Sequence, residues 1–364
     1  MCLTKKSLVI LSFGAFVFPS TAAPGTNTAT MPWIQVSAAG REFVEVGSGK
    51  KFIPWGFNYD HDHKSRLLEE YWDAEWPTVV DDFREMKDLG ANVVRIHLQF
   101  GKFMDAPDTS NKHSLRQLAR LTKLAEDTGL YLDLTGLACY RKSDTPRWYD
   151  ESSEIKRWQA QAKFWEAVAE TCKGSPAIFC YDLINEPFVP GKPRDPGDWL
   201  AGKLGEFYFV QALTLNPKGR TPPQVVEQWT AQLVTAIRKH DKRHAVTLGM
   251  LPISGADFVK AAGKHLDFVC IHEYPETDKI DESLKRLKVF DIGKPVVIEE
   301  LFPLKCSFEE MEKFLEASRA TATGWMSFYW GQTPAQLART NKLPDALVSK
   351  WLTEFQSLKP RIVR

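Results

Sequence analysis

The prediction of the fold starts from the stretch Ile178-Phe179-Cys180-Tyr181-Asp182-Leu183-Ile184-Asn185-Glu186-Pro187. Its mostly apolar run ends in polar residues and a proline, which is typical of a parallel strand covered on both faces. Asn185 and Glu186 then lie at the carboxyl end of the strand, where barrel strands carry functional side chains. Taken alone, this pair fits a solvated loop equally well. A second stretch, Pro295-Val296-Val297-Ile298-Glu299-Glu300, repeats the order of apolar strand and carboxylate.

Helical segments alternate with short apolar strands along most of the chain. The predicted strands cover 53–59, 92–96, 130–134, 178–184, 244–248, 266–271, 295–298 and 324–330. The predicted helices cover 76–89, 115–128, 154–172, 224–240, 255–265, 281–289, 307–321 and 346–358. These pairs, without a break in composition, predict the α/β class and a single-domain (β/α)8 TIM barrel. A doubly wound open sheet is the alternative, but no Gly-rich phosphate loop follows any strand.

Two further segments flank or interrupt this pattern. Residues 34–53 contain short alternating runs between Gly-rich turns, which predict a small N-terminal β-hairpin. Residues 188–223 are rich in Gly and Pro and are predicted to form one long irregular loop with several aromatic residues. Loops of this length are usually functional or disordered, and the aromatic content argues against disorder.

Residues 1–22 have the pattern of a secretory signal peptide. Lys5 and Lys6 precede the apolar run 7–18, and small residues follow at 20–23. The run is too short to span a bilayer comfortably, and a retained anchor is the alternative. We therefore predict a signal peptide over 1–22, a flexible tether over 23–32 and the barrel domain over 33–364. The expected protein is secreted, extracellular or periplasmic, with no membrane segment once the signal is removed.

Composition narrows the classes of partner. The chain has 47 Lys and Arg and 46 Asp and Glu, which gives a net charge of +1. It contains no basic run of the kind that would predict nucleic-acid binding. The cysteines outside the signal, at 139, 172, 180, 270 and 306, are odd in number and lack C-x-x-C spacing, so no structural metal and at most two disulfides are predicted. The run Asp60-His61-Asp62-His63 resembles a metal cluster, but such loop residues are more often solvated or in contact with a sugar.

A closed barrel would bring all strand ends to one rim. The polar or aromatic residues collected there are Asn58, Arg95, Asn185, Glu186, His272, Tyr274, Glu300 and Trp330. Two glutamates would then face each other, and two carboxyl groups flanking a bond are what glycoside hydrolysis needs. Arg95 would keep one of them ionised and Tyr274 would donate to it. The other glutamate, without that support, would hold the proton.

Three of these features together resemble glycoside hydrolase family 5, the cellulase and mannanase family of barrel-fold retaining glycosidases. They are Asn185-Glu186-Pro187 after a strand, His272-x-Tyr274 after a later one, and a glutamate ending the seventh. The segments Gly40–Val44 with Trp55–Asn58, and Gly90–Arg95, are similar to the family's first hairpin and first two strands.

The resemblance implies a role for each residue. Glu186 would be the acid/base and Glu300 the nucleophile. Asn185 would contact the 2-hydroxyl of the sugar, Arg95 and Tyr274 would orient Glu300, His272 would line the site, and Trp330 would be the platform under the sugar. Asn58, at the end of the first strand, is also expected to bind substrate.

The sequence departs from the family pattern near the expected nucleophile. Glu300 is followed by Leu301 and Phe302 rather than by an aromatic residue and Gly, and Glu299 replaces the common preceding Gly. We expect Glu300 to face the site and Glu299 to point the other way along the strand. A shift of the strand register by one residue would exchange the orientations of Glu299 and Glu300. The third strand ends in Thr135-Gly136-Leu137 without the family's His, so the glycone site is expected to differ from that of typical cellulases.

The sequence therefore predicts a secreted, monomeric retaining β-glycosidase that acts on a β-mannan or β-glucan type carbohydrate without a cofactor. The alternatives are a transglycosylase or an exo-acting β-mannosidase or β-glucosidase of the same fold. A carbohydrate-binding protein on a decayed barrel is a non-enzymatic alternative, but both carboxylates and Arg95 are present. The sugar, the linkage and endo or exo action stay open at this level.

Overall fold

The computed structural model describes residues 31–364. The predicted signal peptide, and the tether up to residue 30, lie outside the described residues. Met31 to Arg364 form one compact unit. Within this unit, no helix is both long and apolar enough to cross a membrane.

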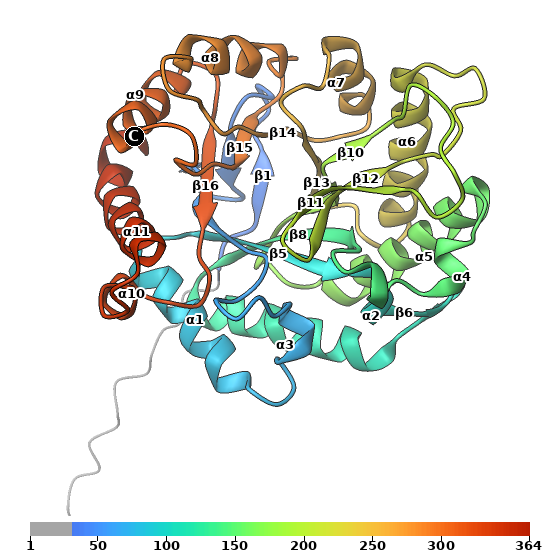
Figure 1. Ribbon diagram of the computed structural model, residues 1–364, viewed down its shortest axis with the longest axis horizontal. Coiled ribbons are helices and arrows are strands. Elements are labelled where there is room, and N and C mark those ends of the chain that lie inside the picture. The colour runs from blue at the N-terminus through green and yellow to red at the C-terminus, as the bar shows by residue number, and fades with distance from the viewer. Residues whose placement is uncertain (1–30) are drawn as a thin grey trace, which may run out of the picture. The chain divides into compact units, whose positions relative to one another are not determined.

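Eight parallel strands close into a barrel in chain order, which confirms the predicted (β/α)8 fold (Figure 1). Strand β16 pairs with β4 and thereby closes the ring. The barrel strands are β4 (Trp55–Tyr59), β5 (Val93–Gln99), β8 (Tyr131–Ala138), β9 (Ile178–Asn185), β13 (Ala245–Met250), β14 (Val269–His272), β15 (Val296–Glu300) and β16 (Gly324–Phe328). They are buried along their whole length, because helices cover them outside and side chains fill them inside.

A ring of helices surrounds the barrel (Figure 1). They are α1 (Trp76–Asp88), α3 (Lys112–Thr128), α5 (Glu154–Cys172), α6 (Pro222–His240), α7 (Ala256–Gly263), α8 (Ile280–Val289), α9 (Phe308–Ser318) and α11 (Leu343–Ile362). Their ends carry local signals: Thr221 and Gln224 form a capping box at the start of α6, and α3 ends at Gly129 with φ of 69°. Short elements lie in the connections: η1 (Leu68–Glu70), α2 (Phe100–Phe103), β6 (Met104–Ala106), β7 (Thr109–Ser110), η2 (Lys142–Asp144), α4 (Arg147–Asp150) and α10 (Pro334–Leu337).

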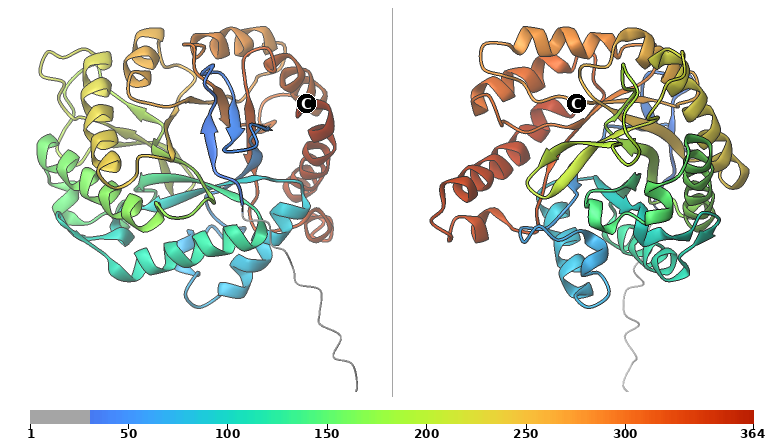
Figure 2. Two further views of the ribbon diagram at one scale, coloured as in Figure 1. Left: turned by 180° about the vertical axis from the view of Figure 1, so that it is seen from behind. Right: turned by 45° about the vertical axis from the view of Figure 1, so that its right-hand side comes forward.

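The N-terminal segment forms three antiparallel strands rather than the predicted two-stranded hairpin. They are β1 (Ile34–Val36), β2 (Phe43–Glu45) and β3 (Lys51–Phe52). The Phe43 ring lies 5.0 Å from the rings of both Phe179 and Phe268, which belong to the amino-terminal ends of the barrel. This small sheet closes that end of the barrel (Figure 2, left), so the carboxyl-terminal end is left for a site.

The prediction of one irregular loop over 188–223 was wrong. The segment contains an antiparallel hairpin, β11 (Leu200–Leu204) and β12 (Phe207–Ala212), and β12 also pairs with β10 (Pro187–Phe188). Gly202 and Gly205 lower the strand propensity of this segment, so the sequence did not indicate these strands. Tertiary packing stabilises them despite the low propensity. That packing comes from Phe207 and Phe209, which contact Tyr140 at the end of β8.

The five cysteines of the described residues are all free thiols. Four of them are buried, and Cys306 is partly exposed. Buried thiols of this kind act as small apolar side chains.

Phe43→Ala is expected to lower the free energy of unfolding by about 3–5 kcal/mol, because it leaves a cavity where the N-terminal sheet meets the barrel. Urea denaturation of the full chain measures this loss. Val46→Ala, at a side chain that is 45% exposed, is the control and should change stability little. Equal losses in both variants would contradict the role given to this sheet.

Candidate active site

Two glutamates meet at the carboxyl-terminal mouth of the barrel. Glu186 directly follows β9, and Glu300 is the last residue of β15. The His272 ring lies between them, with Nδ1 2.9 Å from Glu186 Oε1 and 3.4 Å from Glu300 Oε2. One carboxyl oxygen of each glutamate and one ring nitrogen all lie within 4.8 Å of one another. The structure thus brings together the two carboxyl groups that the sequence paired.

The backbone of Glu186 has a left-handed conformation, with φ of 46°. Such a conformation costs a non-glycine residue about 1–3 kcal/mol and persists where the surroundings hold it. Here the Glu186 N–H donates to the Gly249 carbonyl at 3.0 Å, and the Glu186 carbonyl accepts from the Gln211 N–H at 3.3 Å. A regular strand would send Asn185 and Glu186 to opposite faces, whereas this turn lets both reach the mouth.

Glu300 is held by donors on two sides. Arg95 Nη1 donates to Glu300 Oε1 at 2.6 Å, and the Tyr274 hydroxyl donates to Oε2 at 2.6 Å. Burial raises the pKa of Glu300, while His272 and Arg95 oppose that rise. The carboxyl group therefore depends on these neighbours for its ionised form, which is the form a nucleophile needs.

Arg95 lies fully buried inside the barrel and connects several strands. Its Nη1 also donates to Asn58 Oδ1 at 2.9 Å, and its Nη2 donates to Asp182 Oδ2 at 2.8 Å and to Asn185 Oδ1 at 2.9 Å. Asn58 is itself fully buried, and its amide donates to two backbone carbonyls at 2.8 Å. The structure therefore places Asn58 behind Arg95, as a support for it, rather than where the sequence expected it to bind substrate.

The prediction that Glu299 points away from the site was wrong. Glu299 is fully buried in the barrel interior, with Oε2 3.2 Å from His272 Nε2 and 3.5 Å from Arg95 Nη2. It therefore lies beneath the mouth and contacts the same two cationic or ionisable groups as Glu300.

A β-bulge explains why both glutamates face inward. Val297 packs in the barrel interior, so regular alternation along β15 would place Glu299 inward and Glu300 outward. The pairing of β14 with β15 shifts by one residue between Ile298 and Glu300. Such a bulge turns an additional side chain to the same face. Glu300 reaches the mouth because of this bulge and not because of the simple alternation that the sequence suggested.

Trp330 follows β16 at the rim of the mouth and is half-buried. Its indole N–H donates to Asp60 Oδ1 at 3.1 Å, and its ring stacks on Phe328 with centroids 5.4 Å apart. These contacts hold a flat aromatic side chain at the rim, and a sugar platform requires such a side chain. Asp60 and His61, read from the sequence as loop residues, thus contribute to the rim.

Sequence reasoning missed two buried acids, Asp133 on β8 and Asp182 on β9. Both are fully buried, and their oxygens lie within 4.8 Å of a carboxyl oxygen of Glu299. The available signal was an ionisable residue inside an otherwise apolar strand, since such a residue needs a buried partner. Carboxylates grouped in this way are also metal ligands, but here the Arg95 guanidinium already pairs with them. The prediction of no metal stays untested.

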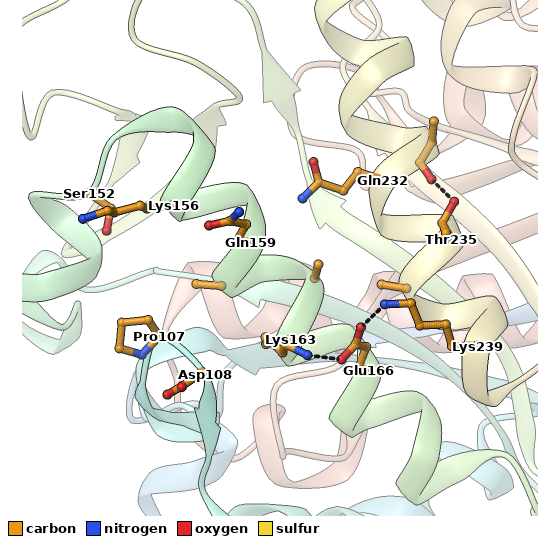
Figure 3. A pocket seen from close by; sticks show the side chains of 14 residues that line it. Pro107, Asp108, Ser152, Lys156, Gln159, Lys163, Glu166, Gln232, Thr235 and Lys239 are labelled. Carbon is orange, nitrogen blue, oxygen red and sulfur yellow. Dashed lines mark hydrogen bonds and ion pairs between the residues drawn. The ribbon is translucent and has the colours of Figure 1, made fainter.

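A separate groove lies away from this mouth, on the outside of α5 and α6 (Figure 3). It has a volume of about 930 Å³ and is lined by small, amide and charged side chains. Lys163 and Lys239 both pair with Glu166 there, at 2.7 and 2.6 Å. Satisfied surface ion pairs of this kind are ordinary solvated groups, so the groove is not the candidate active site.

A closed parallel barrel with two opposed carboxyl groups at its mouth is the architecture of many glycosidases. In agreement, the sequence model of the cellulase family, glycosyl hydrolase family 5, matches residues 57–333. The chain belongs to this family.

Similarity to individual proteins is more distant. Mannan endo-1,4-β-mannosidase A of Podospora anserina is 24% identical over 256 residues, which cover 60% of this chain and 60% of that protein. An exo-β-1,4-mannosidase from Opitutaceae bacterium strain TAV5 superposes with a TM-score of 0.65 at 15% identity, over 91% of this chain and 63% of that one. A β-mannanase from the blue mussel Mytilus edulis superposes with a TM-score of 0.60 at 15% identity, over 91% and 97%. At these identities the solved structures show the shared fold.

Tyr274→Phe is expected to move the acidic limb of the pH profile of kcat/KM to higher pH by about one unit. The variant removes one donor to Glu300, and a hydrogen bond to a charged group is worth about 1.5–3 kcal/mol. The sign follows because the ionised carboxylate is the active form, so a raised pKa removes it at higher pH. Tyr208→Phe, on β12, is the control. A profile unchanged in Tyr274→Phe would contradict the role of this donor.

Proposed function

We propose that this protein is a retaining β-glycosidase that hydrolyses β-mannosidic bonds. The observation that carries the proposal is the pair Glu186 and Glu300 with His272 between them. Retaining glycosidases hold their two carboxyl groups about 5–5.5 Å apart, whereas inverting enzymes leave about 6.5–9.5 Å for a water. Oxygens within 4.8 Å of one another support the shorter, retaining spacing.

Each glutamate has the surroundings that its proposed role requires. Glu300, which accepts from Arg95 and Tyr274, attacks the anomeric carbon and forms a covalent glycosyl-enzyme. Glu186, which contacts the titratable His272 ring, protonates the departing oxygen and then takes a proton from the attacking water. Trp330 supports the sugar ring, and Asn185, whose Oδ1 accepts from Arg95 at 2.9 Å, holds a neighbouring hydroxyl. The reaction needs no cofactor, because the two carboxyl groups supply both acid and nucleophile.

The choice of mannose rests on the relatives. The curated relative and the solved structures compared above are named as mannosidases or mannanases. Another similar structure, from Streptomyces cattleya, is described in complex with Manβ1-4GlcNAc, with a TM-score of 0.59 and 14% identity. These names support a β-linked mannoside as substrate, in preference to a glucan.

We further propose that the enzyme acts at chain ends or on short oligosaccharides, because the β11–β12 hairpin covers one side of the mouth (Figure 2, right). Arg141 fastens the hairpin to the rim, pairing with Glu206 at 3.1 Å and also with Glu70. Its guanidinium lies 5.1 Å from the centre of the Phe207 ring, which also contacts His61 at 5.3 Å. Three loops are thereby joined where a long polymer would otherwise pass.

Endo action on a polymer is the second candidate, and the name of the Podospora anserina relative favours it. A transglycosylase would use the same two glutamates and would be recognised by products extended with an acceptor sugar. Secretion is also a proposal, which rests on residues 1–22. An N-terminus at Ala23 or Pro24 in protein recovered outside the cell tests that proposal.

Glu300→Ala is expected to abolish turnover of all β-mannosides, and azide should restore a product of inverted configuration by replacing the missing nucleophile. Glu186→Ala should lower kcat by about 10²–10⁴-fold on an oligosaccharide, but much less on an aryl mannoside whose leaving group needs no proton. Exposed Glu282 on α8 provides the control, Glu282→Ala. Full activity in either active-site variant, or an equal loss of activity on both substrates for Glu186→Ala, would contradict the assigned roles.

Early products from β-1,4-mannohexaose distinguish the two modes of action. Cleavage at chain ends is expected to release a small sugar that always has the same length. Endo cleavage is expected to give a mixture of oligosaccharide lengths. Arg141→Ala should release the β11–β12 hairpin and add oligosaccharides of intermediate length to the products. The control Arg84→Ala, on the outer face of α1, should leave the product lengths unchanged. A mixture of lengths from the unaltered protein would support endo action instead.

A further inference from the structure

The buried acids beneath the mouth are too many to be ionised together. Asp133, Asp182 and Glu299 are fully buried, and one oxygen of each lies within 4.8 Å of the others. The guanidinium of Arg95 lies 2.8 Å from Asp182 and 3.5 Å from Glu299. Carboxylates in contact within a medium of low polarity repel strongly, so such a group retains a proton.

Hydrogen-bond partners identify which acid holds that proton. Asp182 is fully satisfied: Oδ2 accepts from Arg95 and Thr135, each at 2.8 Å, and Oδ1 accepts from the Gly249 N–H at 2.8 Å. Glu299 Oε2 faces His272 Nε2 at 3.2 Å. Among the described residues, none donates a hydrogen bond to Glu299 Oε1 or to either oxygen of Asp133. A proton on Asp133 would turn this unsatisfied group into a donor for the unsatisfied oxygen of Glu299.

We propose that Asp133 is a protonated acid that donates to Glu299, so that Glu299 stays anionic and fixes the proton of His272 on Nε2. Asp133 and Glu299 are then positioning residues for Glu186, which they influence through His272. The inference rests on the proposed glycosidase function only for the role given to Glu186.

The charges around each group agree with this assignment. Burial raises the pKa of Asp133 well above its usual range, and Glu299 and Asp182 add to the rise. Burial would also raise the pKa of Glu299, but Arg95 and His272 lower it to about 2. Around Asp133 lie the titratable or charged groups Arg95, Cys180, Asp182, Cys270 and Glu299. Around His272 lie Arg95, His97, Glu186, Glu299 and Glu300.

His272 connects the buried acids to the mouth. Burial would lower its pKa, but Glu300, Glu186 and Glu299 raise it to about 10. With Nε2–H directed at the Glu299 anion, Nδ1 faces Glu186 Oε1 at 2.9 Å. The Nδ1 atom can then share one proton with Glu186, donating when Glu186 is ionised and accepting when Glu186 is protonated. This shared proton is the one that the proposed reaction delivers to the departing oxygen.

Gly249 leaves the space for this arrangement. A Cβ atom at position 249 would lie 2.7 Å from Glu299 Oε2, 2.8 Å from His272 Nε2 and 3.0 Å from Arg95 Nη2. Such distances are too short for a side chain, so the three polar groups pack directly against the backbone of β13.

A pair of substitutions at one position tests the proposal in the full chain. Asp133→Asn carries an amide that donates as the protonated acid does, whereas Asp133→Leu carries no donor. We expect Asp133→Asn to keep the basic limb of the pH profile of kcat/KM in place. Asp133→Leu should move it to higher pH, because the Glu299 anion then loses its donor and attracts the proton of His272 more strongly. Glu299→Gln should move the same limb to lower pH by about 1–3 units, since it removes the anion beside His272.

Infrared spectroscopy tests the protonation state without any turnover. The unaltered protein at neutral pH should show a carbonyl band of a protonated carboxylic acid in addition to the bands of other protonated acids such as Glu186, and Asp133→Asn should lose that additional band. If Asp133→Asn keeps the band, or displaces the basic limb as far as Glu299→Gln does, the proposal is wrong. These readouts stand even where Asp133→Leu does not fold. The two proposals can fail separately. If the unaltered protein shows the band, Asp133→Asn loses it, and no β-glycoside is cleaved, the proposed function is wrong but the proton on Asp133 is supported.

Discussion

The site depends on one buried cation, the guanidinium of Arg95. An isolated charge in a barrel interior would be very costly, so its partners must surround it. Asn58, Asp182, Asn185 and Glu300 supply those partners at 2.6–2.9 Å, and they come from three different strands. Removing the guanidinium would leave several carboxylates buried without compensation. The geometry of the mouth is therefore a consequence of how one charge is neutralised.

The two glutamates of the mouth differ because only one of them contacts that cation. Glu300 accepts from Arg95 and Tyr274, whereas Glu186 contacts His272 and takes its direction from a strained backbone turn. Two carboxyl groups placed in unlike surroundings can hold unlike protonation states, which is what acid and nucleophile require. Below them, Glu299 faces the barrel interior and contacts the same histidine, so the imidazole has an acidic partner on each ring nitrogen.

Specificity belongs to a different layer of the molecule. The barrel and its charged centre are compatible with many β-linked sugars, because barrel enzymes vary substrate through their loops. Here the hairpin of β11 and β12, fastened by Arg141 to the opposite rim, shapes one side of the mouth. Its aromatic residues pack on Tyr140 and His61, so the hairpin is part of the folded domain.

The sequence by itself determined the barrel, because each apolar strand and each amphipathic helix carries its own local pattern. The sequence also indicates that the strands carrying Glu186, His272 and Glu300 end at one rim, since parallel strands in a ring bring their carboxyl ends together. Contacts within the folded barrel decide that a bulge turns Glu300 to the mouth, that Asn58 supports Arg95, and that residues 200–212 form a hairpin. Bulges, buried hydrogen bonds and loop packing depend on partners distant in sequence. For the same reason the lone acids Asp133 and Asp182 acquired a meaning only when the fold placed them beside Glu299 and Arg95.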